Sequence, residues 1–551
     1  MASIRLAMIQ TNPTVGAFSA NLETIFNQVQ KAAAEGVRLA VFGEMSVTGY
    51  PIEDLAQRES FVLASELAVA DFATRLEAAG LGEICVVLGH PSKAEESNGW
   101  AIANNSASVI LGGRIIASYA KHHLPNYSVF DEYRVFVPGT EPCIFELDGS
   151  RFGVLICEDI WQAGGPVAAL KGQNLDAVLV LNGSPFEIGK EQARRELVRG
   201  LALELDAAAI YVNLYGGQDD LVFDGKSLAW SADGRVFSVG AGFMLDRVLL
   251  DLENKTFTNC KATEIVLQPS IADVWTALTI GLQDYVEKNG FKSVILGLSG
   301  GIDSAVCAAL AVDAIGPERV FGVSLPSRYS SDHSKSDAFD LARRLGVHIR
   351  TEAIADIVQV SEEQLGLTGL AAENLQARVR GLVLMALSNA EGHLVLTTGN
   401  KTELSVGYST IYGDSVGGYA PLKDVPKTMV WELAKYRNAM AGAGAGADTG
   451  PIPENSISKP PSAELRPDQL DQDSLPEYDL LDAILERYID ERQGRAEIIG
   501  AGFEPETVDR VISLVDKAEW KRRQGAIGPK ITGMAFGRDR RLPITNGFRE
   551  S

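Results

Sequence analysis

The chain has 551 residues, more than one hydrophobic core usually holds, so we expect two domains. Hydrophobic residues make up 46% and charged residues 22% of it, a balance that is typical of globular proteins and excludes general disorder. Its 72 acidic and 50 basic side chains give a formal charge of −22, which disfavours nucleic-acid and membrane partners.

The five cysteines are few, odd in number and not spaced as metal ligands, which indicates a reducing compartment without a disulfide framework. The first residues lack the apolar core of a signal peptide, and no apolar run reaches the roughly 18 residues that a membrane span needs. We therefore expect a cytoplasmic protein.

The first half of the chain alternates strand and helix patterns, which predicts an α/β layer. Three reactive side chains each follow a predicted strand: Glu44 after 38–43, Lys121 after 114–120 and Cys157 after 151–156. Because α/β folds gather polar groups at strand ends, we expect one shared site. There Glu44 would be the base, Cys157 the nucleophile that attacks an amide, and Lys121 the cation that stabilises the oxyanion.

Each of these residues also has a purely structural interpretation. Cys157 could be a small buried apolar side chain, Lys121 a solvated loop charge and Glu44 a carboxylate at a helix start. The adjacent His122 and His123 predict no metal site, because neighbouring residues of a strand point to opposite faces and no third ligand is spaced near them.

Three motifs in this half together resemble the nitrilase superfamily: Phe42-Gly-Glu44, Lys121-His-His-Leu-Pro125 and Cys157-Glu-Asp-Ile-Trp161. The resemblance implies a four-layer αββα sandwich with glutaminase activity. It also implies glutamine contacts from Tyr127, Ser184 and Lys190. Glu132 is a candidate for orienting Lys121, and the alternative is a solvated turn carboxylate.

The second domain is predicted to cover residues 266–551, after a first domain of residues 1–265. At its centre an apolar strand, 293–298, runs into Ser299-Gly-Gly-Ile-Asp-Ser304, and helix formers follow. This order aims backbone N–H groups at one point near a helix N-terminus, which predicts a phosphate site where Asp303 can hold a divalent metal. The alternative is an ordinary turn that a serine caps.

This loop resembles the signature of the ATP pyrophosphatases, which activate a carboxylate with ATP. The stretches 373–381 and 399–418 narrow the resemblance to NAD synthetases, and the first half narrows it to their glutamine-dependent form. The implied fold is a doubly wound parallel sheet of the adenine nucleotide alpha hydrolase type. The implied ATP contacts are Gly297, Leu298, Ser299, Gly300, Gly301, Ile302, Asp303, Ser304 and Thr398.

The same resemblance implies deamido-NAD contacts from Asn374, Glu403 and Lys521. Asp303 and Glu403 would share a magnesium ion, so ATP and Mg²⁺ are the expected co-substrate and cofactor. A segment near 441–464 has little apolar content and several glycines and prolines, which predicts either a mobile lid that becomes ordered with ligand or a plain linker. A homo-oligomer is also expected.

The predicted reaction hydrolyses glutamine to glutamate and channels the ammonia to adenylated deamido-NAD, which yields NAD, AMP and pyrophosphate. One alternative is a glutamine-fed ATP pyrophosphatase that acts on another carboxylate; the motifs around Asn374 and Glu403 argue against it. A second alternative is a nucleotide sensor that controls an amidase without synthesis. Asp303, Glu403 and Lys521 argue against the sensor.

Overall fold

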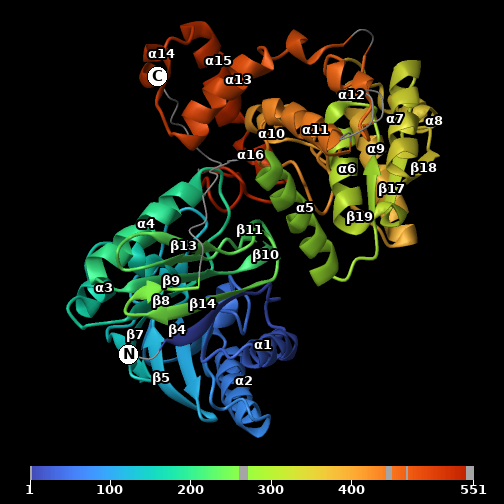
Figure 1. The fold of residues 1–551 in the computed structure, drawn as a ribbon. Helices are drawn as coiled ribbons and strands as arrows, with labels where there is room; N and C mark the ends of the chain where they lie inside the picture. The colour runs from blue at the N-terminus through green and yellow to red at the C-terminus, as the bar shows by residue number, and fades with distance from the viewer. Residues whose placement is uncertain (1–2, 260–270, 442–449, 467–468, 542–551) are drawn as a thin grey trace. The chain divides into compact units, whose positions relative to one another are not determined.

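The computed structural model describes residues 3–259, 271–441, 450–466 and 469–541 (Figure 1). The chain divides into two compact units, one formed by Met1–Gln218 and Val222–Gln268, the other by Asp219–Leu221 and Pro269–Ser551. The predicted domain boundary between residues 265 and 266 lies outside the described residues.

Two packed sheets form the core of the first unit. The seven-stranded sheet has the order β15-β14-β1-β2-β3-β4-β5, and its strands are β1 (Ile4–Gln10), β2 (Leu39–Phe42), β3 (Cys85–Asn98), β4 (Ala101–Leu111), β5 (Arg114–Ala120), β14 (Asp246–Glu253) and β15 (Thr256–Phe257). The six-stranded sheet has the order β13-β12-β9-β8-β7-β6, and its strands are β6 (Cys143–Leu147), β7 (Ser150–Ile156), β8 (Ala177–Asn182), β9 (Ala208–Asn213), β12 (Leu228–Trp230) and β13 (Val236–Val239). Apolar side chains of both sheets meet in one buried cluster.

Helices cover the outer faces of both sheets. Helices α1 (Phe18–Ala34) and α2 (Glu59–Ala78) pack their apolar sides on the seven-stranded sheet. Helices α3 (Gly165–Leu170) and α4 (Lys190–Leu205) pack on the six-stranded sheet. Strands β8 and β9 are buried at every residue because they are covered on both faces, which explains their continuous apolar sequences. The predicted four-layer αββα sandwich is therefore confirmed.

The second unit contains a parallel four-stranded sheet in the order β18-β17-β16-β19. Its strands are β16 (Val294–Gly297), β17 (Val320–Ser324), β18 (His348–Thr351) and β19 (Leu394–Val395). Helices α8 (Ala355–Leu365) and α9 (Leu370–Glu391) share an apolar cluster with one side of this sheet. Helices α6 (Ile302–Ile315) and α7 (Asp332–Leu345) pack on each other and on the sheet, and α5 (Ile271–Lys288) packs on α6. This is the predicted doubly wound fold.

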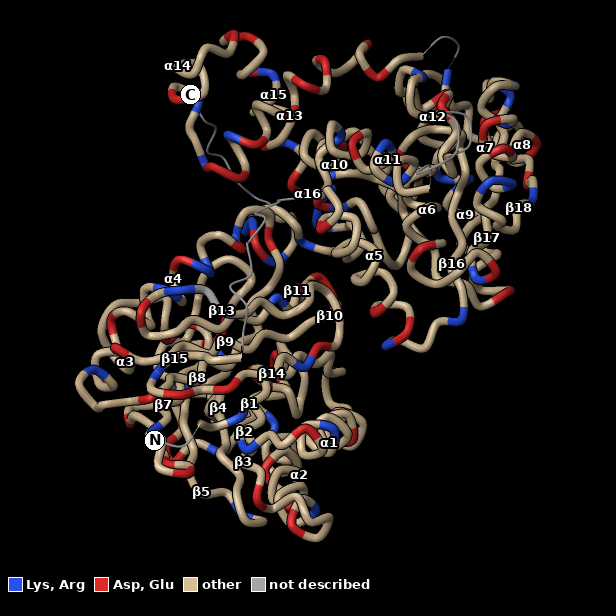
Figure 2. Tube along the Cα trace, viewed as in Figure 1, with Lys and Arg blue, Asp and Glu red and all other residues tan. Residues whose placement is uncertain are grey.

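Further helices follow the sheet in the chain. They are α10 (Lys401–Val406), α11 (Lys427–Ala441), α12 (Glu454–Ser458), α13 (Tyr478–Leu485), α14 (Arg495–Gly500), α15 (Pro505–Lys517) and α16 (Glu519–Arg522). Helices α13 and α15 bury their apolar residues in a separate cluster that includes residues of α10 and α14. Among the described residues, no helix combines the length and the apolar composition that crossing a membrane requires. Acidic residues are spread over the helices of both units, so the net charge is not confined to one segment (Figure 2).

Candidate active sites

The three residues predicted to share a site lie at the carboxyl ends of β2, β5 and β7. The Nζ atom of Lys121 donates to Oε1 of Glu44 at 2.8 Å, and their side chains are 0% and 1% exposed. Cys157 interacts electrostatically with both. The solvated alternative for Lys121 is wrong because its ammonium is buried, and the helix-start alternative for Glu44 is wrong because β2 leads into a turn there.

Both oxygens of the Glu44 carboxylate are held in place. Oε1 also accepts from Nδ2 of Asn105 at 2.7 Å, and Oε2 accepts the backbone N–H of Gly183 at 2.8 Å. Sequence reasoning missed both partners, because they come from β4 and from the end of β8, far from Glu44 in the chain. The carboxylate is thus oriented before any substrate arrives.

A second buried carboxylate completes the surroundings of Lys121. The Lys121 ammonium lies 2.9 Å from Oε2 of Glu132, and the Tyr50 hydroxyl donates to Oε1 of Glu132 at 2.8 Å. Glu132 is 2% exposed, so the solvated-turn alternative is wrong. Burial raises the pKa of Glu132 to about 7. Burial opposes the charge of Lys121, but Glu132 and Glu44 together raise the lysine pKa well above its ordinary value.

Cys157 stands on a sharp turn directly after β7. Its φ of +44° lies in the left-handed region, which is strained for a residue with a side chain. Burial, and next the charge of Glu44, raise the pKa of the Cys157 thiol well above its ordinary value. The resting thiol is therefore protonated and needs a base before it can attack.

Asp159, two residues after the thiol, ties this turn to the strand end that carries Lys121. Its Oδ1 accepts the N–H groups of His122 and His123 at 3.1 and 2.9 Å. Its Oδ2 accepts the Tyr119 hydroxyl at 2.8 Å and the N–H of Ile156 at 2.9 Å. Sequence reasoning missed this role, although Asp159 belongs to the quoted Cys-Glu-Asp motif.

The three predicted glutamine contacts gather around Cys157. The Tyr127 hydroxyl donates to Oε2 of Glu158 at 2.8 Å, while the tyrosine itself is 53% exposed. Ser184 follows Gly183, the donor to Glu44, at the end of β8. Lys190 begins α4, and burial lowers the pKa of its ammonium. Tyr127 and Lys190 both interact electrostatically with Cys157. Their contact with glutamine stays a prediction.

The predicted phosphate loop of the second unit joins β16 to α6. Gly300 has a φ of +79°, and an added Cβ there would lie 2.5 Å from the carbonyl oxygen of Ser334, so only glycine fits. The hydroxyls of Ser299 and Ser304 lie 3.1 Å apart, and the N–H of Gly301 donates to the Ser299 hydroxyl at 3.2 Å. The helix begins at Ile302, inside the motif, so the loop is tighter than the sequence predicts.

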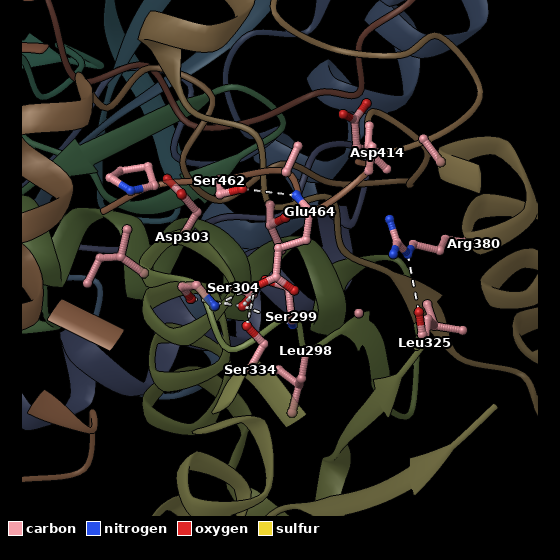
Figure 3. Close-up of a pocket in the computed structure, with 18 of the residues that line it drawn as sticks. Leu298, Ser299, Asp303, Ser304, Leu325, Ser334, Arg380, Asp414, Ser462 and Glu464 are labelled. Carbon is pink, nitrogen blue, oxygen red and sulfur yellow. Dashed lines mark hydrogen bonds between the residues drawn. The ribbon is translucent and has the colours of Figure 1, made fainter. Parts of the chain in front are cut away.

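A cavity of about 270 Å³ opens beside this loop (Figure 3). Of the predicted ATP contacts, all except Gly300 line it. Residues 323–325 of β17 and its carboxyl end also line it, and Nε of Arg380 donates to the Leu325 carbonyl at 3.2 Å across the cavity from Ser299. A polar end at the serines and a more apolar end at β17 suit a nucleotide.

Asp303 and Glu403, the predicted metal ligands, share a cation in this structure. The Lys427 ammonium donates to Oδ2 of Asp303 and, at 3.4 Å, to Oε1 of Glu403. The Lys427 side chain is 1% exposed. Burial raises the pKa of Glu403 to about 8. Sequence reasoning missed Lys427, because nothing in its local sequence distinguishes it from other lysines at helix starts.

Asn374 and Lys521 contact one segment from two elements. Oδ1 of Asn374 on α9 accepts the Thr410 hydroxyl at 2.7 Å. The Lys521 ammonium on α16 donates to the carbonyls of Gly407 and Ser409 at 2.7 and 2.9 Å. Neither residue lines the large cavity, whereas Ser409 lines a neighbouring one of about 60 Å³ together with Thr398 and Glu403. Their predicted contact with deamido-NAD stays a prediction.

Part of the predicted lid lies against the phosphate loop. Residues 442–449 are outside the described residues, but the Ser456 hydroxyl donates to the Gly300 carbonyl at 3.1 Å. Oε1 of Glu464 accepts the hydroxyls of Ser334 and Ser331 at 2.6 and 3.1 Å. In Figure 3 the Glu464 carboxylate points toward Ser299, Ser304 and Ser334. Movement of this segment stays a prediction.

Two family models match the two units. Residues 5–246 match carbon-nitrogen hydrolase, and residues 274–525 match NAD synthase. The glutamine-dependent NAD(+) synthetase of Acinetobacter baylyi is 45% identical over 557 residues, which cover 100% of this chain and 99% of that protein. The same-named protein of Thermotoga maritima is 40% identical over 589 residues, which cover both chains completely.

Solved structures agree with these matches. The glutamine-dependent NAD+ synthetase of Acinetobacter baumannii, in complex with adenosine diphosphate, is 43% identical, with 100% of both chains covered and a TM-score of 0.76. A glutamine-dependent NAD(+) synthetase from Cytophaga hutchinsonii, 21% identical, has the same fold with a TM-score of 0.82 over 99% of this chain and 98% of that one. The predicted resemblance is thereby confirmed, and the chain belongs to the glutamine-dependent NAD(+) synthetase family.

Proposed function

We propose that this protein makes NAD from deamido-NAD, with ATP as co-substrate and glutamine as the nitrogen donor. One observation carries the proposal: a single chain holds both a thiol beside the buried Lys121–Glu44 pair and a cavity built on a phosphate loop. The first arrangement suits amide cleavage, and the second suits activation of a carboxylate. The relatives' name joins the same two reactions.

In the first unit, Glu44 takes the thiol proton as Cys157 attacks the glutamine amide. The carboxylate is already oriented by Asn105 and Gly183, so no reorganisation is needed at that moment. The Lys121 ammonium stabilises the negative charge that forms on the amide oxygen. Glu44 then returns the proton to the departing ammonia, and water releases glutamate from the thioester.

In the second unit, the nicotinate carboxylate of deamido-NAD attacks the α-phosphorus of ATP, which gives an acyl-adenylate and pyrophosphate. The N–H groups of the loop and the hydroxyls of Ser299 and Ser304 would bind the phosphates. Ammonia then displaces AMP. It has to arrive unprotonated, and this need supports the predicted channelling of ammonia from the glutaminase reaction to the adenylate.

Asp303 and Glu403 suit a divalent cation, because their carboxylates already lie close enough to share the Lys427 ammonium. Among the described residues, no group of three or more His, Cys, Asp or Glu side chains is arranged to hold a metal. Two carboxylates that share a magnesium ion with the ATP phosphates are a usual arrangement. Bound magnesium would supply charge neutralisation for the phosphates, and Lys427 would have to move away to make room.

A cytoplasmic location, a homo-oligomeric state and the lack of nucleic-acid or membrane partners belong to the same proposal. The few cysteines support the location, since Cys85, Cys143, Cys157 and Cys307 are free and buried, and Cys260 lies outside the described residues. The formal charge of −22 supports the exclusion of nucleic acid and anionic lipid. Cell fractionation and light scattering test the first two statements.

The experiment supplies ATP, Mg²⁺, deamido-NAD and either glutamine or ammonium, and measures NAD, AMP and glutamate together. The wild type should form NAD and AMP in equal amounts with either donor, and glutamate only with glutamine. Cys157→Ala should lose glutamine-dependent synthesis at least 1,000-fold and keep ammonium-dependent synthesis, because only the first unit uses the thiol.

Three outcomes would contradict the proposal. Loss of ammonium-dependent synthesis in Cys157→Ala would show that the two chemistries are not divided as stated. Glutamine cleavage without any AMP release on deamido-NAD would favour the nucleotide sensor instead. AMP release that requires a different carboxylate substrate would favour another glutamine-fed ATP pyrophosphatase.

A further inference from the structure

Hydrogen bonds connect Ser184 to a buried ion pair that takes no part in the proposed reactions. Nη1 of Arg194 on α4 donates to Oδ1 of Asp224 at 2.9 Å and to Oδ2 at 3.2 Å. The two side chains are 1% and 2% exposed. Asp224 ends β11 (Leu221–Asp224), the partner of β10 (Tyr215–Gln218) in a two-stranded ribbon. Buried pairs contribute little net stability, because desolvation cancels most of their attraction.

Hydrogen bonds lead from this pair to the backbone of Ser184. Nδ2 of Asn213 donates to Oδ1 of Asp224 and to the Ser184 carbonyl, both at 3.1 Å. Oδ1 of Asn213 accepts the Ser184 N–H at 2.9 Å. Of the two ends of the Asn213 amide, only the NH₂ group can donate to a carboxylate, so Asp224 decides which way this amide faces. That orientation, in turn, matches both backbone groups of Ser184.

Arg194 makes fewer hydrogen bonds than we expect of a buried arginine that only stabilises the fold. Within the part of the chain that the structure describes, its Nε and Nη2 atoms are buried without a hydrogen-bond partner. Its guanidinium carbon lies 5.9 Å from the centre of the Tyr211 ring. Unmade hydrogen bonds of a charged group are costly, so an apolar side chain would suit a purely structural position better.

We propose that Arg194 is a positioning residue for glutamine: through Asp224 and Asn213 it holds Ser184 in the place where the substrate binds. It acts without touching the substrate. The inference rests on the proposed glutaminase function. It identifies the contacts that set the affinity of that site for glutamine. Loss of these contacts should weaken glutamine binding without changing the nucleophile, the base or the second unit.

The test compares Arg194→Met with Arg195→Met in the full-length protein. Arg195 is the next residue of α4 and pairs with Glu191, and no hydrogen bond between described residues joins it to Asn213. It therefore reports any general effect of losing an arginine from this helix. Arg194→Met should raise KM for glutamine about 10-fold, with kcat changed less than threefold, because one positioned contact is lost. Arg195→Met should leave KM within twofold of the wild type.

Four further tests separate positioning from general damage. Ammonium-dependent NAD synthesis and the rate of Cys157 alkylation by iodoacetamide should stay at wild-type values in Arg194→Met. Arg194→Lys, which keeps a cation beside Asp224, should recover most of the affinity. The double variant Arg194→Met/Asp224→Asn should match Asp224→Asn alone, because both changes break one chain of contacts.

The proposal is overturned if KM for glutamine does not change in Arg194→Met, or if Arg195→Met raises it equally. It is also overturned if ammonium-dependent synthesis falls together with glutamine use, since that indicates general unfolding. Should Arg194→Met not fold, Asp224→Asn alone has to show the same rise in KM. A wild type that never cleaves glutamine would instead refute the proposed function, and this inference with it.

Discussion

Lys121 and Lys427 each lie between two carboxylates, although they belong to different units. Lys121 contacts Glu44 and Glu132, and Lys427 contacts Asp303 and Glu403. The carboxylates around Lys121 are fixed by further donors, namely Asn105, Gly183 and Tyr50. Neutral donors therefore share the work of holding these carboxylates with the lysine.

The site of Lys427 differs in its proposed use, because a magnesium ion would bind to the same two carboxylates during the reaction. Lys427→Met should lower the free energy of unfolding of the metal-free protein by about 1–3 kcal/mol, since the partly buried carboxylates of Asp303 and Glu403 lose the cation that they share. Added Mg²⁺ should restore part of the loss by binding between Asp303 and Glu403. Calorimetry of the variant and the wild type, each with and without Mg²⁺, measures both effects.

A control variant sharpens that measurement. Lys427→Met/Asp303→Asn lacks one of the two carboxylates and should gain much less stability from Mg²⁺. Equal gains in the two variants would show that the cation binds elsewhere. A loss in Lys427→Met that Mg²⁺ leaves unchanged would also contradict the proposed metal position.

At the scale of elements, His90 joins β3 to its neighbours β4 and α2. Its Nε2 lies 2.8 Å from the Ser108 hydroxyl, and its Nδ1 lies 3.0 Å from the Pro91 carbonyl and 3.4 Å from the Ser65 hydroxyl. Burial lowers the pKa of His90 to about 4. The fold therefore holds a neutral imidazole between strand and helix.

This histidine makes the first unit sensitive to acid. An unfolded histidine has a pKa of about 6.5, so its stabilising contribution is complete above that pH and is lost as the pH falls toward 4. At pH 5 the wild type should have lost about 2 kcal/mol through this group. His90→Asn, which does not titrate, should be less stable at pH 7.5 and lose less on acidification. Unfolding midpoints at both pH values check this, and parallel pH profiles would contradict it.

The strands that carry the thiol site could be predicted closely from the sequence, and those of the second unit less closely. The apolar sequences of β2, β5 and β7 end just before Glu44, Lys121 and Cys157, because polar functional residues follow where a strand ends. The apolar run 394–398 forms a strand only over β19, because the N–H of Thr397 donates to the Tyr419 carbonyl and no longer to β16. Of the stretch 348–354, only 348–351 forms a strand, because Ile354 already precedes α8.

Burial through distant contacts could not be predicted. Glu132 and Asp159 are of residue types that are common in exposed turns. They are buried here only because β5, β7 and the loops that follow these strands pack together. Lys427 and Asp303 are 124 residues apart, and no local pattern relates them. Family resemblance supplied the ligand roles, whereas the partners that orient those ligands came from the structure.

At the scale of the whole molecule, the division into two units predicts independent loss of the two reactions. Asp303→Asn should reduce NAD synthesis at least 100-fold with either nitrogen donor, because it weakens the proposed metal site. Glutamine hydrolysis should persist, since the thiol site lies entirely in the first unit. Glutamate and AMP, measured in one reaction, test the prediction, and the reciprocal Cys157→Ala variant is its control. Abolished glutamate release would mean that the two sites do not function separately.

The enclosed, protonated state of Cys157 has a consequence for the life of the enzyme in the cell. Peroxides react with thiolates far faster than with thiols, and only with those they can reach. At rest Cys157 as a residue is 6% exposed, and burial raises the pKa of its thiol well above the ordinary value. Oxidative stress should therefore spare the nucleophile between turnovers, and NAD supply can continue while more exposed low-pKa cysteines are inactivated.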